Sequence, residues 1–163
     1  MKKATAHLKE IKLAGLKVRT GYQNELNWEV GKIFPCVRDY FHKGIANLIP
    51  ERKNPGTTFC AYTDYTSDHT GEYTYFIGEE VDSFDNLPKE LEQHTIPAQT
   101  YSKFTTEPGA MPDVVKEPWQ KIWAMKPAEL GGKRAFSTDF EIYDERASDH
   151  QKMVLDIYIG IEK

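Results

Sequence analysis

The second half of this chain repeats a pattern found in its first half. Residues 62–69 (YTDYTSDH) are followed by residues 73–78 (YTYFIG), and residues 143–150 (YDERASDH) are followed by residues 155–160 (LDIYIG). An extended apolar run and then a helical pattern precede each copy. Self-similarity of this kind indicates that one structural unit occurs twice. The sequence therefore predicts pseudo-two-fold symmetry, with a cleft where the two units meet.

The first unit divides into a strand, a helix and a hairpin. Residues 8–18 have the apolar pattern of a strand, and from residue 23 apolar side chains recur every three or four positions as far as Leu48. Pro35 lies inside that helical pattern and lacks a backbone donor, so we expect a kink or a break there. Residues 58–65 and 72–81, rich in Tyr, Thr and Phe, form the predicted hairpin.

The second unit follows the same order. Residues 94–104 are extended, a helix is predicted to begin near Pro112 and to end at Pro127, and residues 136–143 and 152–162 form a closing hairpin. The predicted fold is α+β, with a β-α-β-β module occurring twice in one mostly antiparallel sheet and both helices on one face. We expect a single domain over 1–163, with module one in about 1–82 and module two in about 92–163.

Composition excludes several classes of protein. With 39% hydrophobic and 28% charged residues, the chain has the make-up of a soluble globular domain, and its net charge of −4 argues against direct DNA binding. No run approaches the roughly 20 apolar residues of a membrane span, and the N-terminus lacks the apolar core of a signal peptide. We expect a cytoplasmic protein without membrane association, in which Cys36 and Cys60 are free thiols.

Alternation along the hairpin strands predicts two different sheet faces. Phe140 and Ile142 share one face, and Glu141 and Tyr143 share the other, because successive strand residues point to opposite sides. An alignment of the two hairpins by their repeat places an apolar face against the helices. The opposite face is predicted to be aromatic and acidic and to carry Glu141, Tyr62, Phe76, Tyr143 and Tyr158.

Six short runs, taken in order, resemble the effector-binding domain of AraC-type and MerR-type transcription activators, also called the DNA gyrase inhibitor-like domain. The runs are 15–20 (GLKVRT), 62–65 (YTDY), 73–78 (YTYFIG), 96–98 (IPA), 119–123 (WQKIW) and 140–143 (FEIY). The resemblance covers nearly the whole chain. Because 163 residues leave no room for the DNA-binding head of those activators, the chain is most similar to stand-alone members.

The resemblance implies a site in the cleft between the modules. In the family, the Glu of the F-E-x-Y motif, here Glu141, lies in a cleft that binds hydrophobic and often cationic or aromatic molecules. A carboxylate among aromatic side chains is costly unless it is paired, and a cationic ligand relieves that cost. Periodicity alone also allows a solvated Glu on an open sheet face. The expected ligand-binding residues are Glu141, Tyr143, Tyr62, Phe76, Tyr158, Tyr101, Trp123 and Trp28.

Other kinds of site have weaker support. The aromatic candidates also fit ordinary cross-strand pairs, and Trp119 fits the core stripe of its helix. His69 and His150 each follow Ser-Asp in a hairpin connection, where turn chemistry explains them better than a metal site, which needs at least three convergent ligands. No phosphate-binding glycine loop or other cofactor motif is present in the sequence, so we expect neither cofactor nor metal.

Three functions stay open at this point. The favoured one is a stand-alone protein that binds a small-molecule effector or drug, in the manner of multidrug-binding and transcription-regulating relatives. The resemblance also implies a hydrolase of cyclopropane-bearing or other electrophilic toxins, in which Glu141 acts with Tyr143, since burial raises a carboxyl pKa toward the range useful for proton transfer. The third is an inhibitor that binds a protein partner, DNA gyrase.

Overall fold

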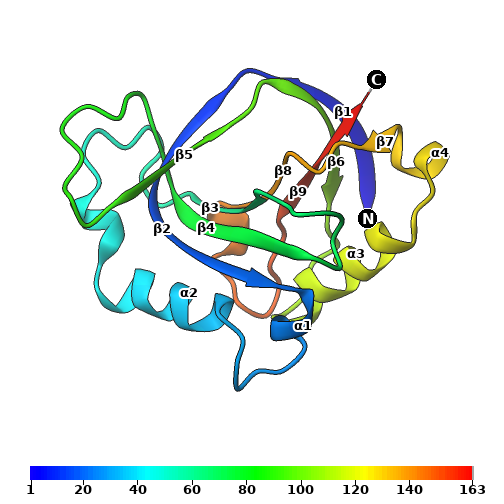
Figure 1. Cartoon of the computed structure of the whole chain (residues 1–163), viewed down its shortest axis with the longest axis horizontal. Helices are drawn as coiled ribbons and strands as arrows, with labels where there is room; N and C mark the ends of the chain where they lie inside the picture. The colour runs from blue at the N-terminus through cyan, green and yellow to red at the C-terminus, as the bar shows by residue number, and fades with distance from the viewer. Residues whose placement is uncertain (163) are drawn as a thin grey trace.

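The computed structural model describes residues 1–162, which form a curved antiparallel sheet with helices against one side. In Figure 1, β1 passes over the upper right of the molecule, β5 rises toward the top, and β2 curves down the left side to end beside α1, with helices α2 and α3 in the lower half. The strands are β1 (Lys2–Leu8), β2 (Ile11–Gly21), β3 (Thr58–Thr63), β4 (Glu72–Val81), β5 (Glu92–Ile96), β6 (Gln99–Thr105), β7 (Lys133–Arg134), β8 (Thr138–Tyr143) and β9 (Asp156–Glu162). The helices are α1 (Tyr22–Glu25), α2 (Ile33–His42), α3 (Asp113–Ala124) and α4 (Pro127–Leu130), with 3-10 turns η1 (Ile45–Leu48) and η2 (Glu145–Ala147).

Strands β3 and β8 form the central seam of the sheet, whose order is β1-β6-β9-β8-β3-β4-β2-β5, with β7 beside β9. Every neighbouring pair is antiparallel. On each side of the seam, three strands follow in the same order: the hairpin partner (β9 or β4), the strand that precedes the helix (β6 or β2) and an edge strand (β1 or β5). The predicted α+β class with an antiparallel sheet is confirmed, and this strand order is compatible with the predicted duplication.

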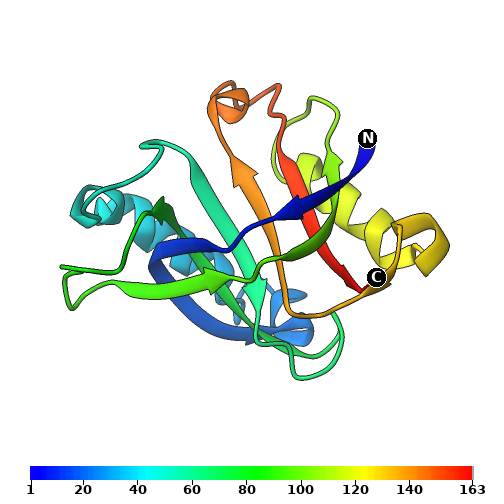
Figure 2. The ribbon, with the colours of Figure 1, turned by 90° about the horizontal axis from the view of Figure 1, so that it is seen from above.

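The edge strands β1 and β5 are absent from the predicted β-α-β-β module. Each half of the sequence begins with an additional strand that pairs with a strand from the other half. Strand β1, from the first half, pairs with β6, and β5, from the second half, pairs with β2 (Figure 2). Strand β1 is largely exposed, so it lacks the buried apolar alternation by which strands are recognised. The strand predicted at 94–104 is divided into β5 and β6.

Helices α2 and α3 pack on the same side of the sheet and enclose two of its three apolar clusters. Cys36 and Tyr40 of α2 pack with Ile77 in one cluster, whereas Trp119 and Ile122 of α3 belong to the other. Tyr62 and Tyr143, at the seam, contact both clusters. The third cluster contains no helical residue and lies on the opposite side of the sheet. It consists of Leu13, Phe59, Ala61, Phe76, Ile96, Tyr101, Phe140 and Tyr158.

The helical predictions need two corrections. The long helix expected from residue 23 to residue 48 is divided into α1, α2 and η1, with residues 26–32 between the first two. Pro35 lies in the first turn of α2, where backbone N–H groups have no helical partner, so it starts this helix instead of kinking it. The second helix does begin after Pro112, but Pro127 opens the short helix α4 and Pro118 lies within α3.

Candidate functional site

Strand β8 carries the Glu141 side chain into the space between the sheet and the helices. In the sheet register Glu141 lies opposite Cys60 of β3 and Ile157 of β9. Its position at the seam places it below the gap between α2 and α3, and the side chain is only 1% exposed. A carboxylate is thus buried at the middle of the molecule, where its hydration must be replaced by protein groups.

Three neutral donors replace that hydration. The Tyr62 hydroxyl donates to Oε2 of Glu141 at 2.9 Å, and the indole Nε1 of Trp119 donates to the same oxygen at 2.6 Å. The Tyr143 hydroxyl donates to Oε1 at 2.7 Å. These donors come from β3, α3 and β8, so the carboxylate links both halves of the molecule. Within residues 1–162, no Lys or Arg forms an ion pair with Glu141.

Burial raises the pKa of the Glu141 carboxyl above its ordinary value of 4.5, and the hydrogen bonds from Trp119, Tyr143 and Tyr62 oppose that shift. The pKa values of the Tyr62 and Tyr143 hydroxyls are raised well above their ordinary range by burial and by the nearby carboxylate. Both tyrosines therefore stay neutral at physiological pH and act as donors. The site is thus a desolvated carboxyl group, and within residues 1–162 no cation lies beside it.

Two cavities flank this carboxylate. The first has a volume of about 450 Å³, and the second about 730 Å³, both within the range of small-molecule sites. The first cavity is lined by Tyr22, Tyr62, Tyr73, Trp119, Trp123 and Arg134, among others. The second cavity is lined by Phe41, Cys60, Tyr75, Met111, Tyr143 and His150, among others. Glu141 itself lines neither cavity, but its donors do: Tyr62 and Trp119 line the first cavity, and Tyr143 lines the second.

Aromatic rings form the outer wall of the first cavity. The rings of His69 and Trp123 are stacked, with centroids 5.1 Å apart and an interplanar angle of 7°. Tyr22 packs edge-on against Trp123 at 5.9 Å. His69 and His150 thus line the two cavities from their hairpin connections. Within residues 1–162, no three His, Cys, Asp or Glu side chains are grouped so that they could hold a metal ion.

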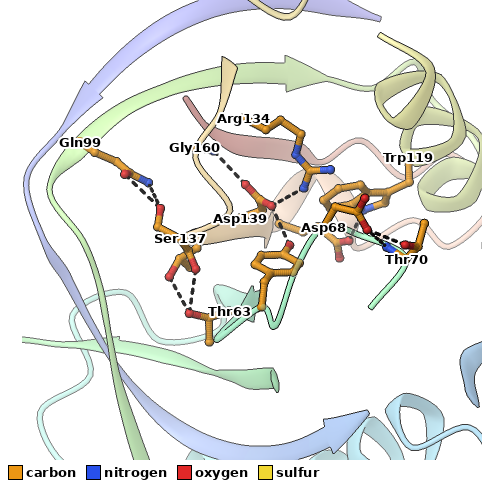
Figure 3. A network of polar contacts seen from close by, with 12 residues as sticks. Thr63, Asp68, Thr70, Gln99, Trp119, Arg134, Ser137, Asp139 and Gly160 are labelled. Atoms are coloured by element: carbon orange, nitrogen blue, oxygen red, sulfur yellow. Dashed lines mark hydrogen bonds and ion pairs between the residues drawn. The ribbon is translucent and has the colours of Figure 1, made fainter. Parts of the chain in front are cut away.

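A second buried carboxylate, Asp139, precedes Glu141 by two residues on β8. Its Oδ2 accepts from Nη2 of Arg134 at 2.6 Å and from the Tyr65 hydroxyl at 2.7 Å, and its Oδ1 accepts from the backbone N–H of Gly160 at 2.9 Å. Figure 3 shows this network. Unlike Glu141, Asp139 has a protein cation as its direct partner.

Three predicted site residues lie on the wrong face of the sheet. Tyr158 pairs with Phe140, and Phe76 pairs with Ala61, so both point away from Glu141 into the third apolar cluster, where Tyr101 also lies. The prediction that Phe76 and Tyr158 share the face of Glu141 is therefore wrong. Both faces of the central strands are buried and apolar, and in that case alternation cannot reveal which side of one strand joins which side of the next.

The other predicted residues are divided between the cleft and the surface. Tyr62 and Tyr143 bond to Glu141, and Trp123 lines the first cavity. Trp28 is 88% exposed and lines neither cavity. Three residues that line the first cavity were not among the predicted site residues: Tyr73, His69 and Arg134. Strand alternation places Tyr73 with Tyr75 and could have identified it, but nothing in the sequence around the two-residue strand β7 indicates the role of Arg134.

Comparison with known families identifies the class of protein to which this chain belongs. The family model described as Cass2, integron-associated effector binding protein, matches residues 6–161. The chain belongs to this family. The finer resemblance to AraC-type activators and gyrase inhibitors stays a prediction.

Similar proteins extend over the whole chain. The Bacillus subtilis (strain 168) protein YobU, whose name describes a transcriptional regulator, is 30% identical over 158 residues, which are 96% of this chain and 96% of YobU. An integron cassette protein from the mobile metagenome of Vibrio cholerae superposes with a TM-score of 0.76 at 23% identity, covering 98% of this chain and 95% of its own. The structure of SAV2435 bound to tetraphenylphosphonium superposes with a TM-score of 0.77 at 16% identity, covering 99% of this chain and 94% of SAV2435. These two structures establish a shared fold.

No helix within residues 1–162 combines the length and the apolar character that crossing a bilayer requires.

Proposed function

We propose that this protein binds a hydrophobic organic cation in the cleft between α2 and α3, with the positive charge beside Glu141. The observation that carries the proposal is the bonding of this carboxylate: it is buried, held by three neutral donors, and has no ion-pair partner among the described residues. A desolvated carboxylate without a counter-ion is unfavourable, and a cationic ligand would supply the missing charge.

The walls of the cleft suit the rest of such a ligand. Tyr62, Trp119 and Trp123 line the first cavity, and Tyr75 and Tyr143 line the second. Aromatic faces attract a cation by about 0.5 to 2 kcal/mol each, depending on how far it is desolvated. Binding of tetraphenylphosphonium, a hydrophobic aromatic cation, by the structural neighbour SAV2435 supports the same ligand class here.

A thermal-shift screen tests the proposal. Wild type, Glu141→Gln and Glu79→Gln are screened with aromatic phosphonium and quaternary ammonium ions and with neutral aromatics of similar size. A compound at about 100 times its Kd stabilises the native state by about 2.7 kcal/mol. Glu79 is the matched control because it is also buried but pairs with Arg52 and lines neither cavity.

The expected result is stabilisation of wild type and Glu79→Gln by cations, with little effect of neutral analogues and a much smaller effect of cations on Glu141→Gln. Equal stabilisation of all three proteins would contradict the role of Glu141. Each compound that binds is then recovered and analysed by mass spectrometry. Unchanged compound agrees with binding alone, and a hydrolysed product would favour the enzymatic alternative.

A further inference from the structure

Arg134 brings a second kind of recognition group into the first cavity. Its side chain is only 10% exposed, yet it lines the cavity together with Trp119 and Lys116. One nitrogen, Nη2, donates to Asp139, and the guanidinium lies 4.2 Å from the ring centroid of Phe136. Two contacts thus hold the group in place without using most of its donors.

Two nitrogens of Arg134 lack an acceptor in the part of the chain that the structure describes. Nε and Nη1 are buried, and neither finds a hydrogen-bond partner within residues 1–162. A guanidinium has five N–H groups, and these two nitrogens carry three of them. Buried donors in native proteins are nearly always paired, since leaving them unpaired is costly. Because Arg134 lines the first cavity, the unpartnered donors of its side chain are evidence for an acceptor supplied by a ligand.

Asp139 does not satisfy these donors. Its two oxygens already accept from Nη2 of Arg134, from the Tyr65 hydroxyl and from the Gly160 backbone. In Figure 3 the guanidinium of Arg134 lies between Asp139 and Trp119. Trp119 also donates to Glu141. The indole of Trp119 therefore lies between the carboxylate of Glu141 and the unpaired N–H groups of Arg134.

We propose that Arg134 binds an anionic oxygen of the ligand, so that the preferred effector is a zwitterion with its cation beside Glu141 and a carboxylate in the first cavity. Charge-assisted hydrogen bonds from a guanidinium to a carboxylate are about twice as strong as neutral ones. Lys116, which lines the same cavity, adds a second positive charge. The cationic half of this inference rests on the proposed function, whereas the anionic half rests on Arg134.

A matched pair of probes separates the two halves. Tetraphenylphosphonium carries only the cation, and (4-carboxyphenyl)triphenylphosphonium adds one carboxylate to the same frame. Kd values for both are measured by calorimetric titration. The ratio of the Kd for tetraphenylphosphonium to the Kd for the carboxylated probe measures the preference for the carboxylate. A substitution that weakens the binding of both probes equally leaves this ratio unchanged.

Two variants of Arg134 remove its spare donors in different ways. Arg134→Lys keeps a cation near Asp139 but loses the Nε and Nη1 groups, and the double variant Arg134→Gln/Asp139→Asn removes both charges and so avoids an unpaired one. Arg52→Lys is the control, since Arg52 also pairs with a buried carboxylate, Glu79, but lines neither cavity. We expect the preference for the carboxylated probe to fall about tenfold in both Arg134 variants and to stay unchanged in Arg52→Lys.

The outcomes are distinguishable. If tetraphenylphosphonium binds and depends on Glu141, but the ratio is the same in wild type and in both Arg134 variants, the Arg134 inference is overturned and the proposed function stands. If only the carboxylated probe binds, and does so through Arg134, the inference is supported and a purely cationic effector is excluded. If neither probe binds wild type, both are overturned.

Discussion

Two carboxylates on one strand, Asp139 and Glu141, have opposite environments. They lie two residues apart on β8, so they share a sheet face, and they are 0% and 1% exposed. Asp139 bonds to the cation of Arg134, to Tyr65 and to the backbone of Gly160, whereas Glu141 bonds to Tyr62, Trp119 and Tyr143, all neutral.

The difference shows how a buried charge can be structural or functional. A buried ion pair that is complete contributes to a fixed arrangement, and breaking it leaves a charge without compensation. A buried carboxylate with neutral donors only is stable enough to be retained but still attracts a cation. Under the proposed function, Glu141 is the carboxylate that binds a cationic ligand, and Asp139 is not, because Asp139 already pairs with Arg134.

The largest expected effect comes from making the same substitution at both positions. Asp139→Asn should reduce the free energy of unfolding by about 3 to 5 kcal/mol, because Arg134 then stays buried without a counter-ion. Glu141→Gln should change it by less than about 1 kcal/mol, because each tyrosine hydroxyl can turn from donor to acceptor and bond the new amide. Urea unfolding at neutral pH measures both. Equal losses of stability would break the comparison.

The pH dependence of stability sharpens the comparison. The pKa of Glu141 is raised in the folded state, so between the ordinary value of 4.5 and the raised value the folded protein holds a proton that the unfolded chain has lost. The stability contributed by this group is fully present below pH 4.5 and is lost as the pH rises through the raised pKa. We expect wild type to lose stability relative to Glu141→Gln over that window. Denaturant unfolding of both proteins from about pH 4 to about pH 8 measures the difference, and parallel curves would contradict it.

A smaller effect is expected from removal of one donor to Glu141. Tyr143→Phe deletes the hydroxyl that donates to Oε1, and this bond lowers the pKa of Glu141, so the pKa should rise further. Binding of tetraphenylphosphonium, which requires the ionised carboxylate, should then begin at a higher pH. Titrations of wild type, Tyr143→Phe and the opposite-face control Tyr158→Phe locate the midpoints. A midpoint that moves equally in both variants would show that Tyr143 has no special role.

The smallest expected effects distinguish two tryptophans. Trp123→Ala removes a ring that lines the first cavity and stacks on His69, and should weaken binding of an aromatic cation by about 0.5 to 2 kcal/mol. Trp28→Ala removes a ring that is exposed and lines neither cavity, so affinity should stay the same. Isothermal titration calorimetry, which does not depend on tryptophan fluorescence, measures the Kd of tetraphenylphosphonium for the two variants. The reverse order of effects would place the ligand outside the first cavity.

The parts of the fold that local sequence patterns determine can be predicted from the sequence. The hairpin of β3 and β4 follows from the Tyr, Thr and Phe alternation of its strands, and its predicted bounds agree with the structure within two residues at Thr63. The position of Glu141 in a cleft was implied by the F-E-x-Y motif. The exchange of β1 and β5 between halves could not be predicted, because it depends on pairing between segments that are distant in the sequence.

The candidate site was predicted less completely for a related reason. The strand register determines which face of β9 lies on the same side of the sheet as Glu141. Because both faces of the central strands are buried and apolar, the sequence pattern does not distinguish them. The sequence therefore predicts, wrongly, that Tyr158 and Phe76 lie on the side of Glu141. Trp119 was assigned to the core, which is correct, but its indole N–H also bonds to Glu141. Arg134 lies in a strand of two residues, and only the three-dimensional arrangement brings it to Asp139.

The most direct test of the central claim is a calorimetric titration of tetraphenylphosphonium into wild type and Glu141→Gln at neutral pH. If Glu141 supplies the charge that a cationic ligand neutralises, wild type should bind at least about tenfold more tightly, because the substitution removes a coulombic attraction of about 3 kcal/mol for unit charges about 5 Å apart at an effective dielectric constant of about 20. Equal affinities in two equally folded proteins would show that the buried carboxylate is structural, as Asp139 is, and would contradict the account.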